Sequence, residues 1–340
     1  MKIDEQKRTR EFSRNTVLES LLHELNQLLT ASETIVLEKY KRPAFPIVFV
    51  MGPHRSGTTL FMQWLASTGI AAYPTNLLSR FYQAPVIGAK IQLLLTDPRY
   101  NFRNELGEFV QQTDYTSENG KTIGALSPNE FWYFWRRFLP DPVRDDWSDA
   151  ELKCQMDIET LLAELAGIMD VFQKPFAAKG MLFNYNIPFL DSIFDKALFV
   201  RISRDLVTNT ESVLEARRRQ LGRDDKWYSF KIPEYDQLKG LEPIMQAAGQ
   251  VSFINMAVDK GMAQVAIHRK LNVQYEKFCS NPKKYYDQIV EKLAIDCPAE
   301  YNGPRQFDIT RKRIIPDYTL INAALDYWKH QQLTSGSNHE

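Results

Sequence analysis

Residues 46–65, which read PIVFVMGPHRSGTTLFMQWL, decide the fold of this chain. The apolar, β-branched run at residues 47–50 predicts a strand that is buried on both faces, as in parallel sheets. A loop bracketed by Gly52 and Gly57 follows. Apolar residues then recur at helical spacing, at Leu60, Phe61, Trp64 and Leu65. The predicted order is therefore strand, glycine-bracketed loop, helix.

This order is typical of an anion-binding site. The first turn of a helix presents unpaired N–H groups and the positive end of the helix dipole. Glycines let the preceding backbone turn further N–H groups in the same direction, so that a phosphate or sulfate binds there. Arg55 adds a fixed charge and a fork of donors. We expect the anion to contact Arg55, Ser56, Gly57, Thr58 and Thr59, and an ordinary tight turn is the alternative without a function.

The loop differs from that of P-loop NTPases, whose pattern is G-x-x-x-x-G-K-[ST]. Gly52 and Gly57 have the spacing of that pattern, but Thr58 stands where the lysine belongs, and the cation is at Arg55. A kinase without this lysine lacks its main contact to the β- and γ-phosphates. The loop therefore favours an anion other than a Mg-bound triphosphate.

Three segments, in order along the chain, resemble sulfotransferases that use 3′-phosphoadenylyl sulfate (PAPS). The motif G-x-x-R-S-G-T-T-L at residues 52–60 resembles the family's 5′-phosphosulfate loop. Residues 197–217, ALFVRISRDLVTNTESVLEAR, resemble its 3′-phosphate segment, in which a strand ends in Arg-Asp and a serine follows in the next helix. Residues 272–282, NVQYEKFCSNP, resemble its Tyr-Glu-x-(Leu/Phe) segment followed by Asn-Pro. The resemblance thus extends from residue 45 to about residue 293.

The resemblance implies roles for individual residues. Arg55 and its loop neighbours would bind the 5′ end of PAPS, and Arg204 and Ser212 would bind the 3′-phosphate. Tyr275 would reach the nucleotide, and Lys179 would face the bridging region of the donor, although it could also be an ordinary surface lysine. The family's Arg-Asp is often followed by proline, which only shapes the start of the helix and is leucine here. PAPS is the implied sulfuryl donor, and no metal is needed.

The implied fold is a three-layer α/β/α domain with a mostly parallel central sheet, the P-loop-NTPase-like sulfotransferase fold. The alternation of strand and helix patterns independently supports an α/β class. We expect this sulfotransferase domain at residues 41–330, after an N-terminal helical segment at residues 1–40 and before a disordered tail at residues 331–340. The helical segment could pack on the domain or pair with a second copy as a homodimer, and we favour packing. Further strands are expected at residues 70–73, 175–179, 198–202 and 270–275, and helices at 84–95, 149–172 and 240–268.

The implied activity is the transfer of a sulfuryl group from PAPS to a hydroxyl or amine of an acceptor, with release of PAP. The aromatic residues at 131–135 and the absence of a basic excess favour a neutral glycan or small molecule as acceptor. A P-loop-type small-molecule kinase and a non-catalytic nucleotide-binding protein on the same fold are the alternatives.

The base that takes the acceptor's proton is left open among Glu130, His54 and Asp114. Glu130 also fits a capping box, because Ser127 and Pro128 precede it as N-cap and first helical residue. We favour the capping role for Glu130. At the C-terminal end, basic residues that could close over the donor are Arg311 and Arg313.

Composition narrows the class of protein. The 340 residues include 42 Lys+Arg and 42 Asp+Glu, so the formal net charge is zero, whereas a nucleic-acid-binding protein would have a basic excess. The three cysteines are widely spaced and predict neither a metal site nor a disulfide framework. No apolar run is long enough for a signal core or a membrane span. We therefore expect a cytoplasmic enzyme.

Overall fold

Four parallel strands form the central sheet, in the order β4-β1-β5-β6. These strands are β1 (Ile47–Met51), β4 (Phe176–Lys179), β5 (Ala197–Ser203) and β6 (Lys270–Gln274). This computed structural model describes residues 8–105, 117–118, 121–141, 144–309 and 317–336. Because the strands are parallel, their carboxyl ends meet at one edge, where open α/β sheets bind ligands.

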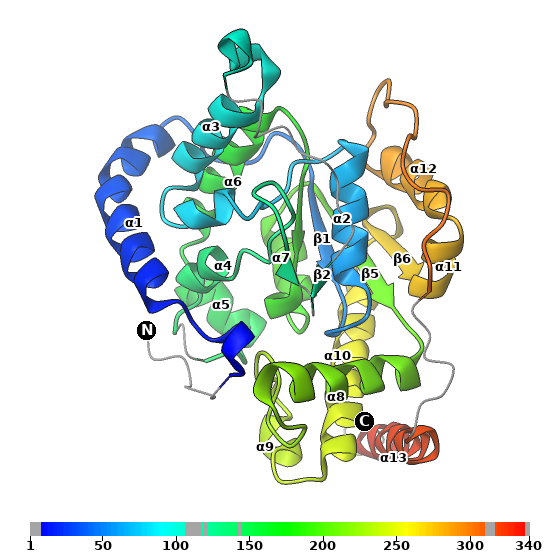
Figure 1. Cartoon of the computed structure of the whole chain (residues 1–340). Helices are drawn as coiled ribbons and strands as arrows, with labels where there is room; N and C mark the ends of the chain where they lie inside the picture. The colour runs from blue at the N-terminus through cyan, green and yellow to red at the C-terminus, as the bar shows by residue number, and fades with distance from the viewer. Residues whose placement is uncertain (1–7, 106–116, 119–120, 142–143, 310–316, 337–340) are drawn as a thin grey trace.

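Helices surround the sheet (Figure 1). The α-helices are α1 (Thr16–Leu37), α2 (Thr58–Thr68), α3 (Pro85–Thr96), α4 (Trp132–Phe138), α5 (Asp149–Gln155), α6 (Ile158–Phe172), α7 (Ile187–Ile193), α8 (Leu206–Leu221), α9 (Tyr235–Leu238), α10 (Pro243–Gln264), α11 (Tyr275–Ser280), α12 (Pro282–Lys292) and α13 (Tyr318–Gly336). Short 3-10 helices are η1 (Arg10–Phe12), η2 (Leu78–Phe81), η3 (Pro98–Tyr100), η4 (Phe102–Asn104), η6 (Met181–Phe183) and η7 (Ile267–Arg269). A separate antiparallel hairpin pairs β2 (Ser117–Glu118) with β3 (Lys121–Thr122).

The alternation of side chains along β1 divides the interior into two cores. Ile47, Phe49 and Met51 point into a core built with α4, α6, α7 and α10. Val48 and Val50 point the other way, into a core built with α2, α11 and α12. All five side chains of β1 are fully buried. The strand is therefore buried on both faces as its composition predicts, and the three-layer α/β fold is confirmed.

Two predicted elements differ from the structure. Residues 70–73 form no strand, and Ala72 makes an isolated bridge to Phe176. The predicted helix at residues 149–172 is two helices, α5 and α6, because Met156 is extended and Asp157 begins a new helix by accepting a hydrogen bond from Thr160 N–H. The helices at residues 84–95 and 240–268 correspond to α3 and α10.

The N-terminal helix α1 packs beside α3 and α6 (Figure 1). On its inner face the buried Glu33 carboxylate accepts hydrogen bonds from the N–H groups of Val86 and Ile87, at 2.7 and 3.0 Å. These donors belong to the first turn of α3, whose N–H groups have no helical partner. Helix α1 is therefore held on the domain by a buried polar contact. Pairing of two copies through α1 stays a prediction.

Helix α13 packs on α8 and α10, at the lower end of the molecule as drawn in Figure 1. The Trp328 ring lies 5.3 Å from that of Phe253, and its N–H donates to the Met245 carbonyl. The helix runs to Gly336 and so includes residues 331–336, where the sequence predicts a disordered tail.

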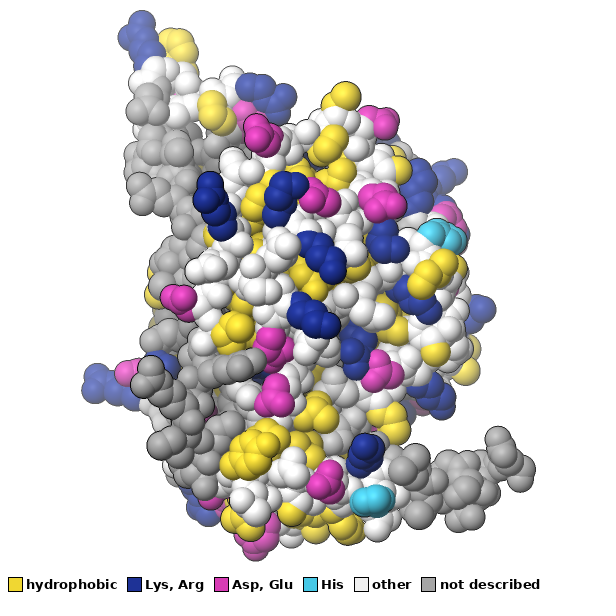
Figure 2. Space-filling model, turned by 90° about the vertical axis from the view of Figure 1, so that its right-hand side faces the viewer, with side chains coloured by type: hydrophobic (Ala, Val, Ile, Leu, Met, Phe, Trp, Pro, Cys, Tyr) yellow, Lys and Arg dark blue, Asp and Glu magenta, His cyan; other side chains and the backbone are white. Residues whose placement is uncertain are grey.

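The surface is mixed in charge. Basic and acidic side chains are interspersed over the face shown in Figure 2, as expected for a chain whose formal net charge is zero. Among the helices of the described residues, none is long and apolar enough to cross a membrane.

Candidate active site

The loop between β1 and α2 takes a conformation that requires its two glycines. Gly52 has a φ of +142° and Gly57 a φ of +102°, values that residues with a side chain rarely adopt. A Cβ on Gly52 would lie 2.5 Å from the carbonyl oxygen of Ile202, and a Cβ on Gly57 would lie 2.2 Å from Cδ2 of Tyr275. The loop is therefore packed tightly between β5 and the start of α11.

Asn184, which no sequence motif indicates, holds the start of the loop. Asn184 follows β4 and η6, and its side chain forms two hydrogen bonds with Gly52: Gly52 N–H donates to Oδ1 at 3.0 Å, and Nδ2 donates to the Gly52 carbonyl at 2.9 Å. Asn184 is buried. This reciprocal pair fixes the loop as an adjacent strand would, and only its position after a strand end could have indicated it.

Residues of all three family-like segments meet at this loop. Arg55 Nε donates to Ser212 Oγ at 3.2 Å, and Arg204 Nη1 donates to the Arg55 carbonyl at 3.0 Å. The Arg204 guanidinium also lies over the Tyr275 ring, 4.7 Å from its centroid. Residues from three stretches of the chain, around Arg55, Arg204 to Ser212, and Tyr275, thus lie together, although these stretches are far apart in the sequence.

The start of α8 is held by two carboxylates. Asp205 caps the helix by accepting from Thr208 N–H at 2.9 Å. Its own N–H donates to Glu276 Oε1 at 3.1 Å, which ties α8 to α11. These contacts position Arg204, which immediately precedes Asp205, beside the loop.

Lys179 lies at the carboxyl end of β4 and connects α2, the helix that follows the loop, to Glu130. Its Nζ donates to Thr59 Oγ1 at 2.7 Å and to Glu130 Oε1 at 2.9 Å. The lysine side chain is buried, so the alternative of an ordinary surface lysine is wrong. Glu130 is 29% exposed at its side chain and also accepts a hydrogen bond from Trp132 Nε1. A small pocket beside this network is lined by Glu130, Trp132, Trp135, Lys179, Met181 and Leu182.

The capping-box prediction for Glu130 is wrong. Helix α4 begins at Trp132, and its N-cap, Phe131, is in the left-handed region with a φ of +57°. Asn129 explains this start, because its Oδ1 accepts from Phe131 N–H at 2.8 Å and forms an Asx turn. The Ser127 hydroxyl donates to the Ile123 carbonyl instead of capping α4. Glu130 is therefore outside the helix and directed to Lys179.

Glu130 is ionised at neutral pH. Burial alone would raise its pKa, but the Lys179 ammonium and the hydrogen bonds from Trp132 and Lys179 outweigh that effect and hold the pKa below its ordinary value. A carboxylate in this state can accept a proton from a bound hydroxyl.

His54 lies in the same region but is neutral. Its side chain is buried, and burial lowers its pKa to about 4. Its ring packs edge-on against Phe230 and Tyr228, with centroids 4.6 and 5.8 Å away. The other residues proposed from the sequence at this edge, Asp114, Arg311 and Arg313, lie outside the described residues.

Comparison with known proteins gives the family of the chain. Residues 46–299 match the family model described as Sulfotransferase family, which spans well over half of the chain. This chain belongs to the sulfotransferase family. Family membership favours sulfuryl transfer over the kinase alternative. No curated protein matches the chain.

Solved sulfotransferase structures are similar to the chain at low identity. The sulfotransferase domain from the Synechococcus PCC 7002 olefin synthase is 19% identical, with 86% of this chain and 89% of that domain covered and a TM-score of 0.40. Sulfotransferase STF1 from Mycobacterium tuberculosis H37Rv is 15% identical, with 81% and 73% covered and a TM-score of 0.48. STF9 from Mycobacterium avium is 15% identical, with 82% and 69% covered and a TM-score of 0.45.

Within the part of the chain that the structure describes, no three His, Cys, Asp or Glu side chains are placed to hold a metal ion. The cations beside the loop are instead Arg55, Arg204 and Lys179.

Proposed function

We propose that this chain transfers the sulfuryl group of PAPS to a hydroxyl group of an acceptor, with Glu130 as the general base. The observation that carries the proposal is the Thr59–Lys179–Glu130 network. The network connects the first turn of α2 to an ionised carboxylate. The first turn of this helix can bind the donor's anionic end. Lys179 thus places a base next to the anion site, so that an acceptor hydroxyl at Glu130 would lie close to the donor's sulfuryl group.

Donor binding follows from the groups that surround the loop. The loop N–H groups, with Ser56, Gly57, Thr58 and Thr59, would bind the 5′-phosphosulfate, and Arg55 would neutralise it. Ser56 supports this role, because its hydroxyl is buried and has no hydrogen-bond partner among the described residues.

The 3′-phosphate would bind to Arg204 and Ser212. Ser212 lies on α8 and already contacts Arg55 at 3.2 Å, so the two ends of the donor site are adjacent. Tyr275, which packs against Gly57 and under Arg204, would contact the nucleotide. Selectivity for PAPS over a donor without the 3′-phosphate would depend on Arg204 and Ser212.

The chemical step is a single displacement at sulfur. The acceptor oxygen forms a bond to the sulfur as the bond from sulfur to the bridging oxygen of PAPS breaks. Glu130 takes the acceptor's proton, and the leaving oxygen stays with PAP. An ammonium has three N–H donors, and Lys179 uses two of them on Thr59 and Glu130, so the third can bind that oxygen. Preorganised cations of this kind stabilise charge where it develops in the transition state.

Glu130→Gln tests the proposal, with Glu164→Gln as the matched control. Both glutamates pair with a cation, Glu130 with Lys179 and Glu164 with Arg137, but only Glu130 adjoins the loop. Glutamine keeps an oxygen that can accept from Lys179 and removes the base. PAPS turnover over a panel of neutral glycans should fall about 10²- to 10⁴-fold in Glu130→Gln, with PAP affinity by calorimetry unchanged. Glu164→Gln should keep the wild-type rate.

Three results would contradict parts of the proposal. A wild-type rate in Glu130→Gln would exclude Glu130 as the base. A wild-type protein that binds no PAP would exclude PAPS as the donor, and one that binds PAP without any turnover would favour the non-catalytic alternative.

A further inference from the structure

His54 is a buried polar side chain that the proposed reaction leaves without a role. It is 4% exposed, and neither ring nitrogen has a hydrogen-bond partner within the described part of the chain. Buried polar atoms are nearly always hydrogen-bonded, because an unpaired one keeps its full desolvation cost. Two orphaned nitrogens on one ring therefore indicate a group that a ligand completes.

His54 is held in place at its backbone and at its ring. The His54 carbonyl accepts from Asn209 Nδ2 at 2.7 Å, which anchors the backbone of the residue to α8. The ring itself packs edge-on against Tyr228 and Phe230. These two aromatics belong to the segment between α8 and α9 and not to the donor loop.

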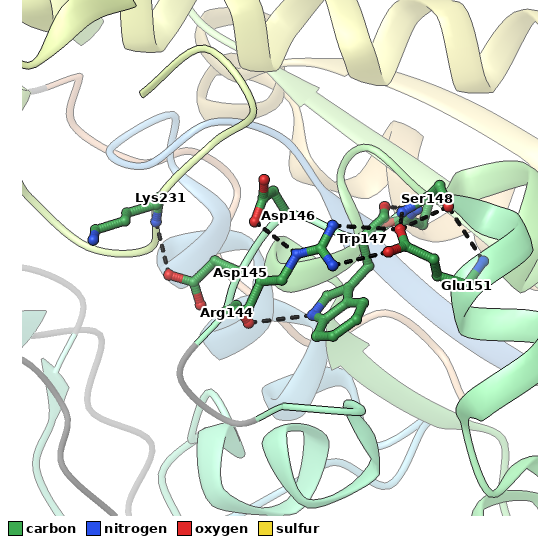
Figure 3. A network of polar contacts seen from close by, with 8 residues as sticks. Arg144, Asp145, Asp146, Trp147, Ser148, Glu151 and Lys231 are labelled. Atoms are coloured by element: carbon green, nitrogen blue, oxygen red, sulfur yellow. Dashed lines mark hydrogen bonds and ion pairs between the residues drawn. The ribbon is translucent and has the colours of Figure 1, made fainter. Parts of the chain in front are cut away.

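That segment is itself positioned by the polar network in Figure 3. Lys231 N–H donates to Asp145 Oδ2 at 2.8 Å, and Asp145 also pairs with Arg136 of α4. On either side of Asp145 in the sequence, Arg144 and Ser148 form hydrogen bonds with the side chain of Glu151 at the start of α5. The segment that carries Tyr228 and Phe230 is thus fixed to α4, the helix that follows Glu130.

The aromatic residues connect His54 to Glu130. The Phe230 ring is 4.6 Å from that of His54 and 6.3 Å from that of Trp132, whose N–H binds the Glu130 carboxylate. His54 and Glu130 also interact electrostatically. His54 and Glu130 are therefore linked through one group of aromatic side chains, Phe230 and Trp132, and an aromatic face of this kind can pack against the apolar face of a sugar ring.

The two groups differ in hydrogen-bonding capacity. An ionised carboxylate only accepts, which suits the hydroxyl that loses its proton. A neutral imidazole has one N–H donor and one acceptor nitrogen, which suits a hydroxyl that both donates and accepts and is not consumed. His54 is neutral, as described above.

We propose that His54 binds a second hydroxyl of the acceptor, next to the one that is sulfated, so that the acceptor is a neutral polyol such as a sugar. This inference rests on the proposed function, because it takes Glu130 as the site of the reacting hydroxyl. His54 acts as a specificity-determining residue, and the phosphate loop thereby contributes to both substrates.

The test compares two probes that differ by one hydroxyl, trans-1,2-cyclohexanediol and cyclohexanol. Each is titrated into full-length protein saturated with PAP, and binding is followed by the ring ¹⁵N signals of the histidines. The chain has five histidines, and the spectrum of His54→Phe identifies the signals of His54. Phenylalanine keeps the aromatic packing and removes both nitrogens, and His54→Asn serves as a second variant that restores one donor and one acceptor.

In the wild type the diol should shift the His54 signals and bind about two- to tenfold more tightly than the mono-alcohol, the factor of one net hydrogen bond. This preference should disappear in His54→Phe and partly return in His54→Asn, with the affinity for PAP unchanged in both. Equal binding of the two probes, a preference that survives in His54→Phe, or no response of His54 to the diol would overturn the inference. Failure of the wild type to bind PAP would instead overturn the proposed function.

Discussion

Replacing Gly57 by alanine should destabilise the protein through two separable effects. The φ of +102° is strained for any residue with a Cβ, at about 1–3 kcal/mol. The added Cβ would also lie 2.2 and 2.6 Å from two atoms of the Tyr275 ring, and overpacking of this kind costs about 1–3 kcal/mol. The sum is about 2–6 kcal/mol. At about 1.4 °C per kcal/mol for a chain of this size, the melting temperature should fall by about 3–8 °C.

Gly69→Ala is the matched control for the strain alone. Gly69 has a φ of +69° at the end of α2, and a Cβ there would have no atom within 4 Å. Its substitution should cost only about 1–2 kcal/mol, measured by the same thermal unfolding.

A double-mutant cycle with Tyr275→Leu isolates the clash. Removing the ring should recover about 1–3 kcal/mol of the loss in Gly57→Ala, so the two changes should not be additive. Additive losses, or a Gly57→Ala protein no less stable than Gly69→Ala, would show that the loop does not pack against Tyr275 as described.

Three further outcomes follow from the same contacts. Arg204→Ala and Ser212→Ala should each weaken PAP binding about ten- to hundredfold in calorimetry and spare adenosine 5′-phosphosulfate, which lacks the 3′-phosphate; equal losses for both nucleotides would contradict the assignment. Because the pKa of Glu130 is held below the ordinary 4.5, the acid limb of kcat/KM for PAPS turnover should lie below pH 4.5, and a limb near neutrality would exclude it as the base. Burial raises the pKa of Glu164 to about 7, so between about pH 4.5 and 7 this carboxyl keeps its proton in the folded state and loses it in the unfolded state. The melting temperature should therefore fall as the pH rises through this range, and Glu164→Gln should flatten that slope.

The donor side of the site could be predicted because its residues occupy fixed places in short motifs. Arg55 follows a buried strand by four residues, and Arg204 directly follows another strand of the parallel sheet. Parallel strands bring their carboxyl ends together, so residues 149 positions apart in sequence lie in contact once the sheet forms.

The acceptor side could not be predicted in the same way. The pattern around Glu130 fits a capping box, and the competing Asx turn at Asn129 differs from it only in which side chain reaches the backbone. The partner that decides the role of Glu130 is Lys179, a contact that no local pattern contains. The boundary between α5 and α6 could have been predicted, because Asp157 is a preferred N-cap residue directly before an apolar run with helical spacing.

The position of β1 has a consequence for how this chain is made. β1 lies in the middle of the sheet, yet both of its neighbours come much later in the sequence: Val48 pairs with Ala177 and with Leu198. At about 5–20 residues per second, the ribosome needs roughly 8–30 s to reach β5 after it has made β1. For most of that interval, until β4 has also been made, an apolar strand has two open edges and no native partner, which makes the nascent chain prone to aggregation. We expect proteolysis of ribosome-stalled chains to cleave β1 when the chain ends before β5 emerges, and to spare it once β5 is outside; equal cleavage of both lengths would show that β1 is protected by earlier contacts.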